Sequence, residues 1–285
     1  MRFIYFIIII TVSFTSCKKN PGCTDPAAIN YDSEANRDDR SCQYLGVNNP
    51  FELDIPAQFS QLLPAPNIPE NNPLTDAGVL LGRKLFYDPI LSGDNTQSCA
   101  GCHNQANGFT DNGLQFSTGI DLLQGNRNAM PIFNLVWNYE DTYFWDGRVT
   151  GVESQAYIPV TDPIEMHENW PNAVANLQAD SEYPSLFNTA FGTDIIDSSL
   201  VTMAIAQFER TLISGDSRFD KYMRGEISLT PSEFSGYSVF MDEAGGDCFH
   251  CHGDINNPLW TDNIYHNNAL DATFTDLGLG AVTGN

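Results

Sequence analysis

The chain has 285 residues, with 13 Lys and Arg against 36 Asp and Glu, so its formal net charge is −23. This length is enough for one or two domains with a hydrophobic core. So acidic a chain repels nucleic acids and anionic lipid surfaces, which excludes functions that depend on binding them. The charge either attracts a basic partner protein or serves solubility alone.

The first residues are typical of an export signal. A short basic start precedes an apolar run, Phe3 to Phe14, that is too short for a comfortable membrane span. Thr15-Ser16-Cys17 then resembles the site at which bacterial lipoproteins are cleaved and lipidated on the cysteine. We expect a signal peptide at residues 1–17, location in the periplasm or at the cell surface, and membrane attachment only through lipid on Cys17. An uncleaved anchor and a plain signal peptide are the alternatives.

Two cysteines, Cys23 and Cys42, flank an Asp-rich segment. Cys17 and the two C-x-x-C pairs described below account for the other five cysteines, and an exported protein can keep a disulfide, so we expect Cys23 and Cys42 to pair. The segment resembles a short Cys-flanked module found near the start of some bacterial surface proteins. We interpret residues 18–47 as a disulfide-closed spacer, with calcium binding by its loop as the alternative.

Residues 48–70 are rich in Pro and Asn, which disfavours helix and predicts an extended linker. Thr75 is a suitable N-cap for a helix that runs to about Tyr87, with Pro89 just beyond its end. The buried side of this helix is expected to carry Val79, Leu80 and Leu85.

Helical periodicity returns after a Gly- and Asn-rich stretch. The expected helices are Val152–Tyr157, Ala173–Leu177, Ser185–Phe191 and Ser199–Ile213, the last with Val201, Ile205, Phe208 and Leu212 on one stripe. A second unit is expected to begin near Ser214. Thr230-Pro231-Ser232-Glu233 then combines a capping box with Pro at the first helical position. Its helix carries Phe234, Tyr237 and Phe240. Strand signals are sparse, so the expected fold class is mainly α.

The sequence C-x-x-C-H occurs twice, at 99–103 and 248–252, each time after a predicted amphipathic helix. It is the attachment signature of c-type haem, in which both cysteines form thioethers and the histidine ligates the iron. A disulfide-exchange site does not need the histidine, and the cysteine pairs of a zinc site usually lie closer in sequence. We therefore expect two covalent c-type haems. Their attachment residues are Cys99, Cys102 and His103 for the first, and Cys248, Cys251 and His252 for the second.

Six further strings follow in order around these motifs. They are Leu81–Asp88, Gly125–Asn128, Phe144–Arg148, Asp162–Met166, Phe208–Leu212 and Thr261–Asn267. With them, the chain from about Pro69 onwards resembles the bacterial di-haem cytochrome c peroxidases, including their MauG-type relatives. The resemblance implies two cytochrome c-like domains, a peroxidatic one at 71–214 and an electron-transfer one at 215–285. Family chains usually continue further, so the second domain is expected to be incomplete.

The resemblance also implies roles for individual residues. Glu165 matches the acid–base residue of the peroxide pocket, and Gln155 matches an amide of the same pocket. Trp145 matches the aromatic residue between the two haems. Asn128 matches one ligand of a calcium ion between the domains. A surface carboxylate and a core aromatic are the alternatives for Glu165 and Trp145.

Many family members carry a histidine, in the loop before Arg127, that ligates the peroxidatic iron at rest. That position here is Ile120, and no other histidine lies between His103 and His167. We therefore expect a first haem that is open to peroxide without prior reduction. His167 is expected at the surface, with the peroxide pocket as the alternative. The distal ligand of the second haem is left open among Met223, Met241 and Tyr265.

Together these features predict an oxidoreductase, a cytochrome c peroxidase. It would reduce hydrogen peroxide to water with electrons from a small redox protein, a cytochrome c or a cupredoxin. MauG-like oxidation of a protein or organic substrate, and a non-catalytic di-haem electron carrier, are the alternatives. The oligomeric state is left open, with a homodimer as one candidate.

Overall fold

The computed structural model describes residues 19–24, 32–38, 49–267 and 270–284. The chain divides into two compact units, residues 1–46 and 47–285. The expected signal peptide and its lipid site, Cys17, lie outside the described residues. Within the described ranges, no helix has the length and apolar character that crossing a membrane requires.

The smaller unit holds a minimal parallel sheet. Strands β1 (Pro21–Gly22) and β2 (Arg37–Asp38) pair through two residues each. Cys23, which follows β1, is buried and disulfide-bonded. Its expected partner, Cys42, lies outside the described residues, so the pairing stays a prediction.

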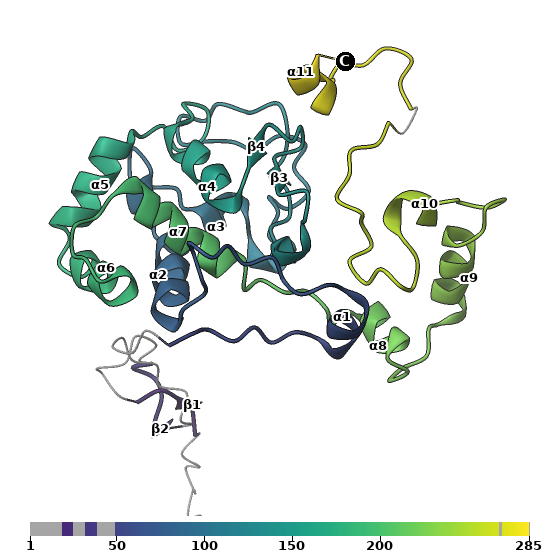
Figure 1. Ribbon diagram of the computed structural model, residues 1–285, viewed down its shortest axis with the longest axis horizontal. Helices are drawn as coiled ribbons and strands as arrows, with labels where there is room; N and C mark the ends of the chain where they lie inside the picture. The colour runs from purple at the N-terminus through teal and green to yellow at the C-terminus, as the bar shows by residue number, and fades with distance from the viewer. Residues whose placement is uncertain (1–18, 25–31, 39–48, 268–269, 285) are drawn as a thin grey trace, which may run out of the picture. The chain divides into compact units, whose positions relative to one another are not determined.

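The larger unit is mainly helical, as predicted (Figure 1). Its only strands within the described residues are the short antiparallel pair β3 (Thr142–Tyr143) and β4 (Val149–Thr150). The helices are α1 (Ala57–Leu62), α2 (Asp76–Tyr87), α3 (Cys99–Cys102), α4 (Val152–Thr161), α5 (Trp170–Ala179), α6 (Tyr183–Phe191), α7 (Ser198–Glu209), α8 (Arg218–Met223), α9 (Pro231–Phe240), α10 (Phe249–His252) and α11 (Leu279–Thr283). Three single 3-10 turns, Pro89–Leu91, Gln105–Asn107 and Leu135–Trp137, lie between them.

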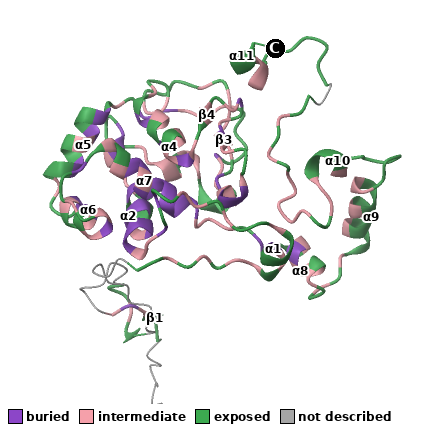
Figure 2. Cartoon of the chain, in the orientation of Figure 1, coloured by how far each residue is buried: buried purple, intermediate pink, exposed green. Residues whose placement is uncertain are grey.

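Helices α2 and α7 pack side by side and carry much of the core (Figures 1 and 2). The predicted N-cap of α2 is confirmed, because the Thr75 hydroxyl accepts a hydrogen bond from the Gly78 amide at 3.1 Å. Leu81 and Leu85 of α2 pack in one buried cluster with residues of α7. At Gly82 the two helices come so close that an added Cβ would lie 1.8 Å from the Ala204 carbonyl oxygen.

This crossing predicts that Gly82→Ala destabilises the protein by at least about 1–3 kcal/mol, because a methyl group must push two buried helices apart. The melting temperature followed by circular dichroism should fall by roughly 2–4 °C for each kcal/mol. Gly236, in α9, is a matched control because nothing lies within 4 Å of its added Cβ. Gly236→Ala should be neutral or stabilising by up to about 1 kcal/mol. Equal losses in the two variants would contradict the close packing of α2 on α7.

The Pro-rich stretch 48–70 was expected to be only an extended linker, and this expectation is wrong. It contains α1, whose sequence Ala57–Leu62 has no proline and follows Pro56 at the N-cap. Phe59 of this helix is fully buried and meets Trp137 edge-to-face, with 5.1 Å between the ring centroids. The stretch therefore supplies a helix and a core side chain.

Two expected helices differ from the observed ones. The helix expected to reach Ile213 ends at Glu209, because the amides of Thr211 and Leu212 bond to carbonyls three residues back and tighten the last turn. In α9 the capping box forms as predicted, but the helix buries none of its residues, and Phe234 is 54% exposed. The expectation of an amphipathic helix before the second C-x-x-C-H sequence is therefore not met in this structure.

Candidate active site

The first C-x-x-C-H sequence forms a one-turn helix with its histidine at the end. Cys99 and Cys102 open and close α3 and carry free thiols, and burial raises their pKa values to about 12 and about 11. His103 caps the turn, and its Nδ1 lies 3.1 Å from the Phe109 carbonyl oxygen. Burial lowers the pKa of His103, which favours the neutral ring. The Phe109 contact orients the ring and leaves Nε2 as the nitrogen that can bind a metal.

A cavity of about 370 Å³ lies beside this turn. Cys102 and His103 line one part of it. The residues that the sequence singled out elsewhere in the chain also line it, namely Asn128, Trp145, Gln155 and Glu165. Segments far apart in the sequence therefore meet at one site.

Glu165 lies in the turn after α4, where its amide donates to the Asp162 carbonyl at 3.0 Å. Burial raises the pKa of its carboxyl to about 7; the nearby Asp162 carboxylate adds to the rise and Arg148 opposes it. A carboxyl with a pKa near neutrality can both accept and return a proton at physiological pH. Gln155, on α4 next to the buried Ala156, brings an amide to the same cavity.

Trp145 is held at the wall of the cavity. Its indole Nε1 donates to the Asn128 carbonyl at 2.9 Å, and the residue is 47% exposed. It is therefore no core aromatic in this structure. The Asn128 carbonyl accepts the hydrogen bond from the Trp145 indole. In the ranges that the structure describes, no group of three or more His, Cys, Asp and Glu side chains is placed to hold a metal ion. Calcium binding at Asn128 stays a prediction.

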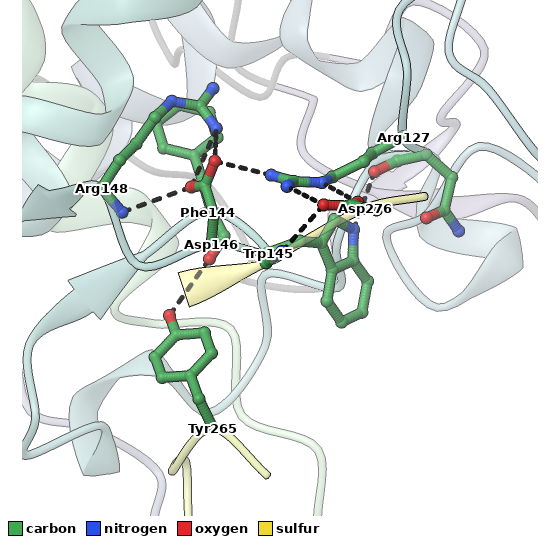
Figure 3. A network of polar contacts seen from close by, with 9 residues as sticks. Arg127, Phe144, Trp145, Asp146, Arg148, Tyr265 and Asp276 are labelled. Carbon is green, nitrogen blue, oxygen red and sulfur yellow. Dashed lines mark hydrogen bonds and ion pairs between the residues drawn. The ribbon is translucent and has the colours of Figure 1, made fainter. Parts of the chain in front are cut away.

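A charged network behind Trp145 ties this wall to the C-terminal part of the chain (Figure 3). Arg127 bonds Asp146 at 2.6 Å and makes two bonds to Asp276, at 2.7 and 2.6 Å. Arg148 also bonds Asp146, at 3.0 Å, and Tyr265 donates to a nearby backbone carbonyl at 3.2 Å. Sequence reasoning missed this network, since Arg127 and Asp276 lie 149 residues apart and nothing local links them.

Glu209 is a second carboxyl that sequence reasoning missed as a site residue. It lines a smaller cavity of about 50 Å³ together with Cys99, Gln155 and Glu165. Its Oε2 has no hydrogen-bond partner among the described residues, and burial raises its pKa to about 8. In the sequence, Glu209 is part of the string Phe208–Leu212, which could have indicated a site residue. Its position in α7 is equally consistent with a purely structural role.

The raised pKa of Glu209 predicts a pH-dependent stability. The folded state holds this proton more tightly than the unfolded state, so stability is lost as the pH rises from 4.5 to about 8. Glu209→Gln removes the titrating group. At pH 7 the variant should therefore avoid a loss of up to about 3 kcal/mol in the free energy of unfolding. Thermal melts at several pH values should show a flatter curve for this variant than for the wild type. A curve of unchanged slope would mean that Glu209 does not titrate in this range.

The second C-x-x-C-H sequence forms α10, with Cys248 as the N-cap, and is more exposed to solvent than the first. Its thiols, Cys248 and Cys251, are free, and the ring of His252 lies 6.2 Å from that of Phe240. Phe240 also lines an apolar cavity of about 580 Å³, which Trp260 and other aromatic residues border. Tyr265 is one of the three candidate distal ligands of the second haem. In this structure its hydroxyl donates a hydrogen bond to the Phe144 carbonyl.

A model of the family described as "Di-haem cytochrome c peroxidase" matches residues 76–228. The chain belongs to this family. The methylamine utilization protein MauG of Methylorubrum extorquens is 38% identical over 74% of this chain and 58% of its own length. Cytochrome c peroxidase Ccp of Escherichia coli is 40% identical over 67% of this chain and 40% of its own length. The chain thus spans little more than half of one relative and less than half of the other.

Among solved structures, a MauG-like protein associated with microbial copper homeostasis matches 82% of this chain and 71% of its own, with a TM-score of 0.69 and 31% identity. Membership in the di-haem peroxidase family implies haem cofactors. The residues of the first site fit such a group, because two free thiols and a backbone-anchored histidine stand beside a cavity. The donor set of the second site has the same chemistry.

Proposed function

We propose that this chain is a peroxidase that holds two covalent c-type haems and reduces hydrogen peroxide to water with electrons from a small redox protein. The observation that carries the proposal is the convergence of Glu165, Gln155 and Trp145 on one cavity beside the first C-x-x-C-H turn. The resemblance alone had led us to expect Glu165 and Gln155 in the peroxide pocket and Trp145 between the two haems. A non-catalytic electron carrier needs no cavity with a proton-exchanging carboxyl next to its iron ligand.

In this proposal the cysteines of each motif form thioether bonds, and His103 and His252 ligate the two irons. The haems supply redox-active iron that accepts electrons and passes them on. At the first site the neutral His103 ring offers Nε2, while its Nδ1 is held by the Phe109 carbonyl.

Glu165 carries the proton chemistry. The overall reaction, H₂O₂ + 2e⁻ + 2H⁺ → 2H₂O, breaks the O–O bond with two electrons from the small redox protein. The Glu165 carboxylate would take a proton from one peroxide oxygen and return it to the other, which leaves as the first water. The remaining oxygen would become the second water with the two electrons and two protons from solvent. The Glu165 pKa of about 7 suits both of its steps at neutral pH. The Gln155 amide is placed to hydrogen-bond and orient peroxide in the same cavity.

Trp145 would carry electrons between the two haems, the role that its match to the family implies. The hydrogen bond from its indole to the Asn128 carbonyl fixes the ring at the cavity wall. The donor would be a basic cytochrome c or cupredoxin, because a chain with a formal charge of −23 attracts a cationic partner. Such a donor suits an exported protein anchored through lipid on Cys17, which we also propose.

A second candidate is MauG-like oxidation of a protein or organic substrate. The half-exposed Trp145 favours it, because an aromatic side chain that reaches the surface can take electrons from a bulky substrate directly. Both candidates use the same cavity and the same Glu165. They differ in the source of the electrons.

The proposal is tested with the full-length, haem-loaded protein. We expect two haems per chain, and peroxide consumption that oxidises two molecules of reduced basic cytochrome c for each peroxide. Added salt should slow this oxidation, since it screens attraction between opposite charges. Peroxide consumption without oxidation of any small redox protein would favour the MauG-like candidate. Two haems with no peroxide consumption would leave an electron carrier.

A further inference from the structure

One wall of the first cavity is a hairpin formed by residues 117–127. The Ser117 amide donates to the Arg127 carbonyl at 3.1 Å, and the Gly125 amide donates to the Ser117 carbonyl at 3.0 Å. At its tip, residues 119–123, the Gly119 amide donates to the Leu123 carbonyl at 3.0 Å. Several residues of the hairpin line the same cavity as Glu165.

The tip of this hairpin lies directly on the segment that carries Glu165. The Ile120 amide donates to the Glu165 carbonyl at 3.0 Å. Gly119 packs so tightly that an added Cβ would lie 1.9 Å from the Ile164 carbonyl oxygen and 2.5 Å from that of Glu165. Asp121 adds a side-chain link, since its Oδ2 lies 2.5 Å from Nδ1 of His167.

Gly93 also contacts this segment. The Gly93 amide donates to the Met166 carbonyl at 2.8 Å, and an added Cβ at Gly93 would lie 2.5 Å from the His167 carbonyl oxygen. Gly93 and the hairpin tip therefore both contact segment 164–167, and they lie close to each other, since an added Cβ at Gly93 would be 3.5 Å from Cδ1 of Ile120. In the described residues, the tip is hydrogen-bonded to this segment only through the Ile120 amide and the exposed Asp121–His167 pair, so it can leave without breaking the helical core.

We propose that the tip of hairpin 117–127 is a clasp that positions Glu165, and that the Asp121–His167 pair holds it closed. Asp121 and His167 are positioning residues, because neither lines the cavity. This inference rests on the proposed function for the part that Glu165 plays in turnover. It assigns a role to two exposed residues that the peroxide chemistry does not use.

Opening the clasp has a defined electrostatic consequence. The charged groups that act on Glu165 are Asp162 and Arg148, and opening the tip removes neither of them. Cys99 and Cys102 do not titrate in the haem-loaded protein, because their sulfurs are then proposed to be thioethers. What changes is burial, which is the main cause of the raised pKa of Glu165. Water at an open clasp should therefore move that pKa from about 7 toward the ordinary value of 4.5.

The test compares three variants of the haem-loaded protein. Asp121→Ala removes the side-chain link, Gly119→Ala forces the tip away through its Cβ, and Asp194→Ala is a control at an exposed aspartate. Hydrogen exchange in peptides covering 117–127 should be about two- to fivefold faster in Asp121→Ala, as expected for loss of a partly exposed pair, and faster still in Gly119→Ala. The infrared band of the protonated carboxyl that Glu165→Gln abolishes should titrate at lower pH in both. Asp194→Ala should match the wild type in both measurements.

Unchanged exchange in Asp121→Ala and Gly119→Ala would overturn the clasp. Faster exchange with an unchanged Glu165 titration would overturn its positioning role, because the tip would then open without exposing the carboxyl. If exchange and titration both change while peroxide turnover stays as in the wild type, the clasp stands. The proposed role of Glu165 in turnover fails instead.

Discussion

Glu165→Gln is expected to slow peroxide reduction by about 10²–10⁴-fold, the usual contribution of a positioned acid–base group, while haem content stays unchanged. The amide has nearly the same size and fills the same place in the cavity, but it cannot accept and return a proton. In the wild type, turnover should rise as the pH passes through about 7, because the deprotonated carboxyl takes the first proton. That dependence should vanish in the variant.

Glu140→Gln is the matched control, since Glu140 is exposed and lies outside the cavity lining. It should keep wild-type turnover and the wild-type pH profile. If Glu165→Gln turns over peroxide as fast as Glu140→Gln does, Glu165 has no part in the mechanism, and another group in the cavity must move the proton.

Cys99→Ser combined with Cys102→Ser is expected to remove one covalent haem and all peroxide turnover. Serine cannot form the thioether bonds, and His103 alone does not hold the group covalently. A haem assay on denatured protein should fall from two covalent haems per chain to one. The second motif should retain its haem, because its own cysteines are untouched.

The control is Cys23→Ser combined with Cys42→Ser. These cysteines are assigned to the small N-terminal unit and to no haem, so both haems and their absorption spectra should stay. Loss of either haem in this variant would show that the seven cysteines are assigned wrongly.

Much of the fold followed from local signals. The N-cap at Thr75 and the capping box at Thr230 form as predicted, because a cap depends only on residues within one turn. The end of α7 and the presence of α1 were predicted wrongly. Helix α7 ends early because local hydrogen bonds tighten its last turn, and α1 forms where Phe59 is buried in the core.

Helices α2 and α9 show why burial is harder to predict than helix formation. Gly82 and Phe86 in α2 have the same spacing as Gly236 and Phe240 in α9, and each helix precedes a C-x-x-C-H sequence. Yet α2 is buried against α7, whereas α9 buries none of its residues. The same local pattern gives different burial because the partner surface is set elsewhere in the chain.

The candidate site, like the fold, could be predicted only in part from the sequence. The family resemblance assigned Glu165 and Gln155 to the peroxide pocket and Trp145 to the space between the haems, and the structure places all three around one cavity. Their roles stay predictions. The contact of Ile120 with Glu165, and that of Arg127 with Asp276, join distant segments through bonds with no local sequence pattern. Such contacts become visible only once the fold brings the segments together.

The most direct test of the account is rapid mixing of the oxidised, haem-loaded protein with one equivalent of hydrogen peroxide, without prior reduction, followed by absorption. We expect the bands of one haem to change within milliseconds in the wild type and at least tenfold more slowly in Glu165→Gln. A change that appears only after one haem is reduced would mean that another residue ligates the first iron, against the inference from Ile120. No change in either state would contradict the peroxidase proposal and leave an electron carrier.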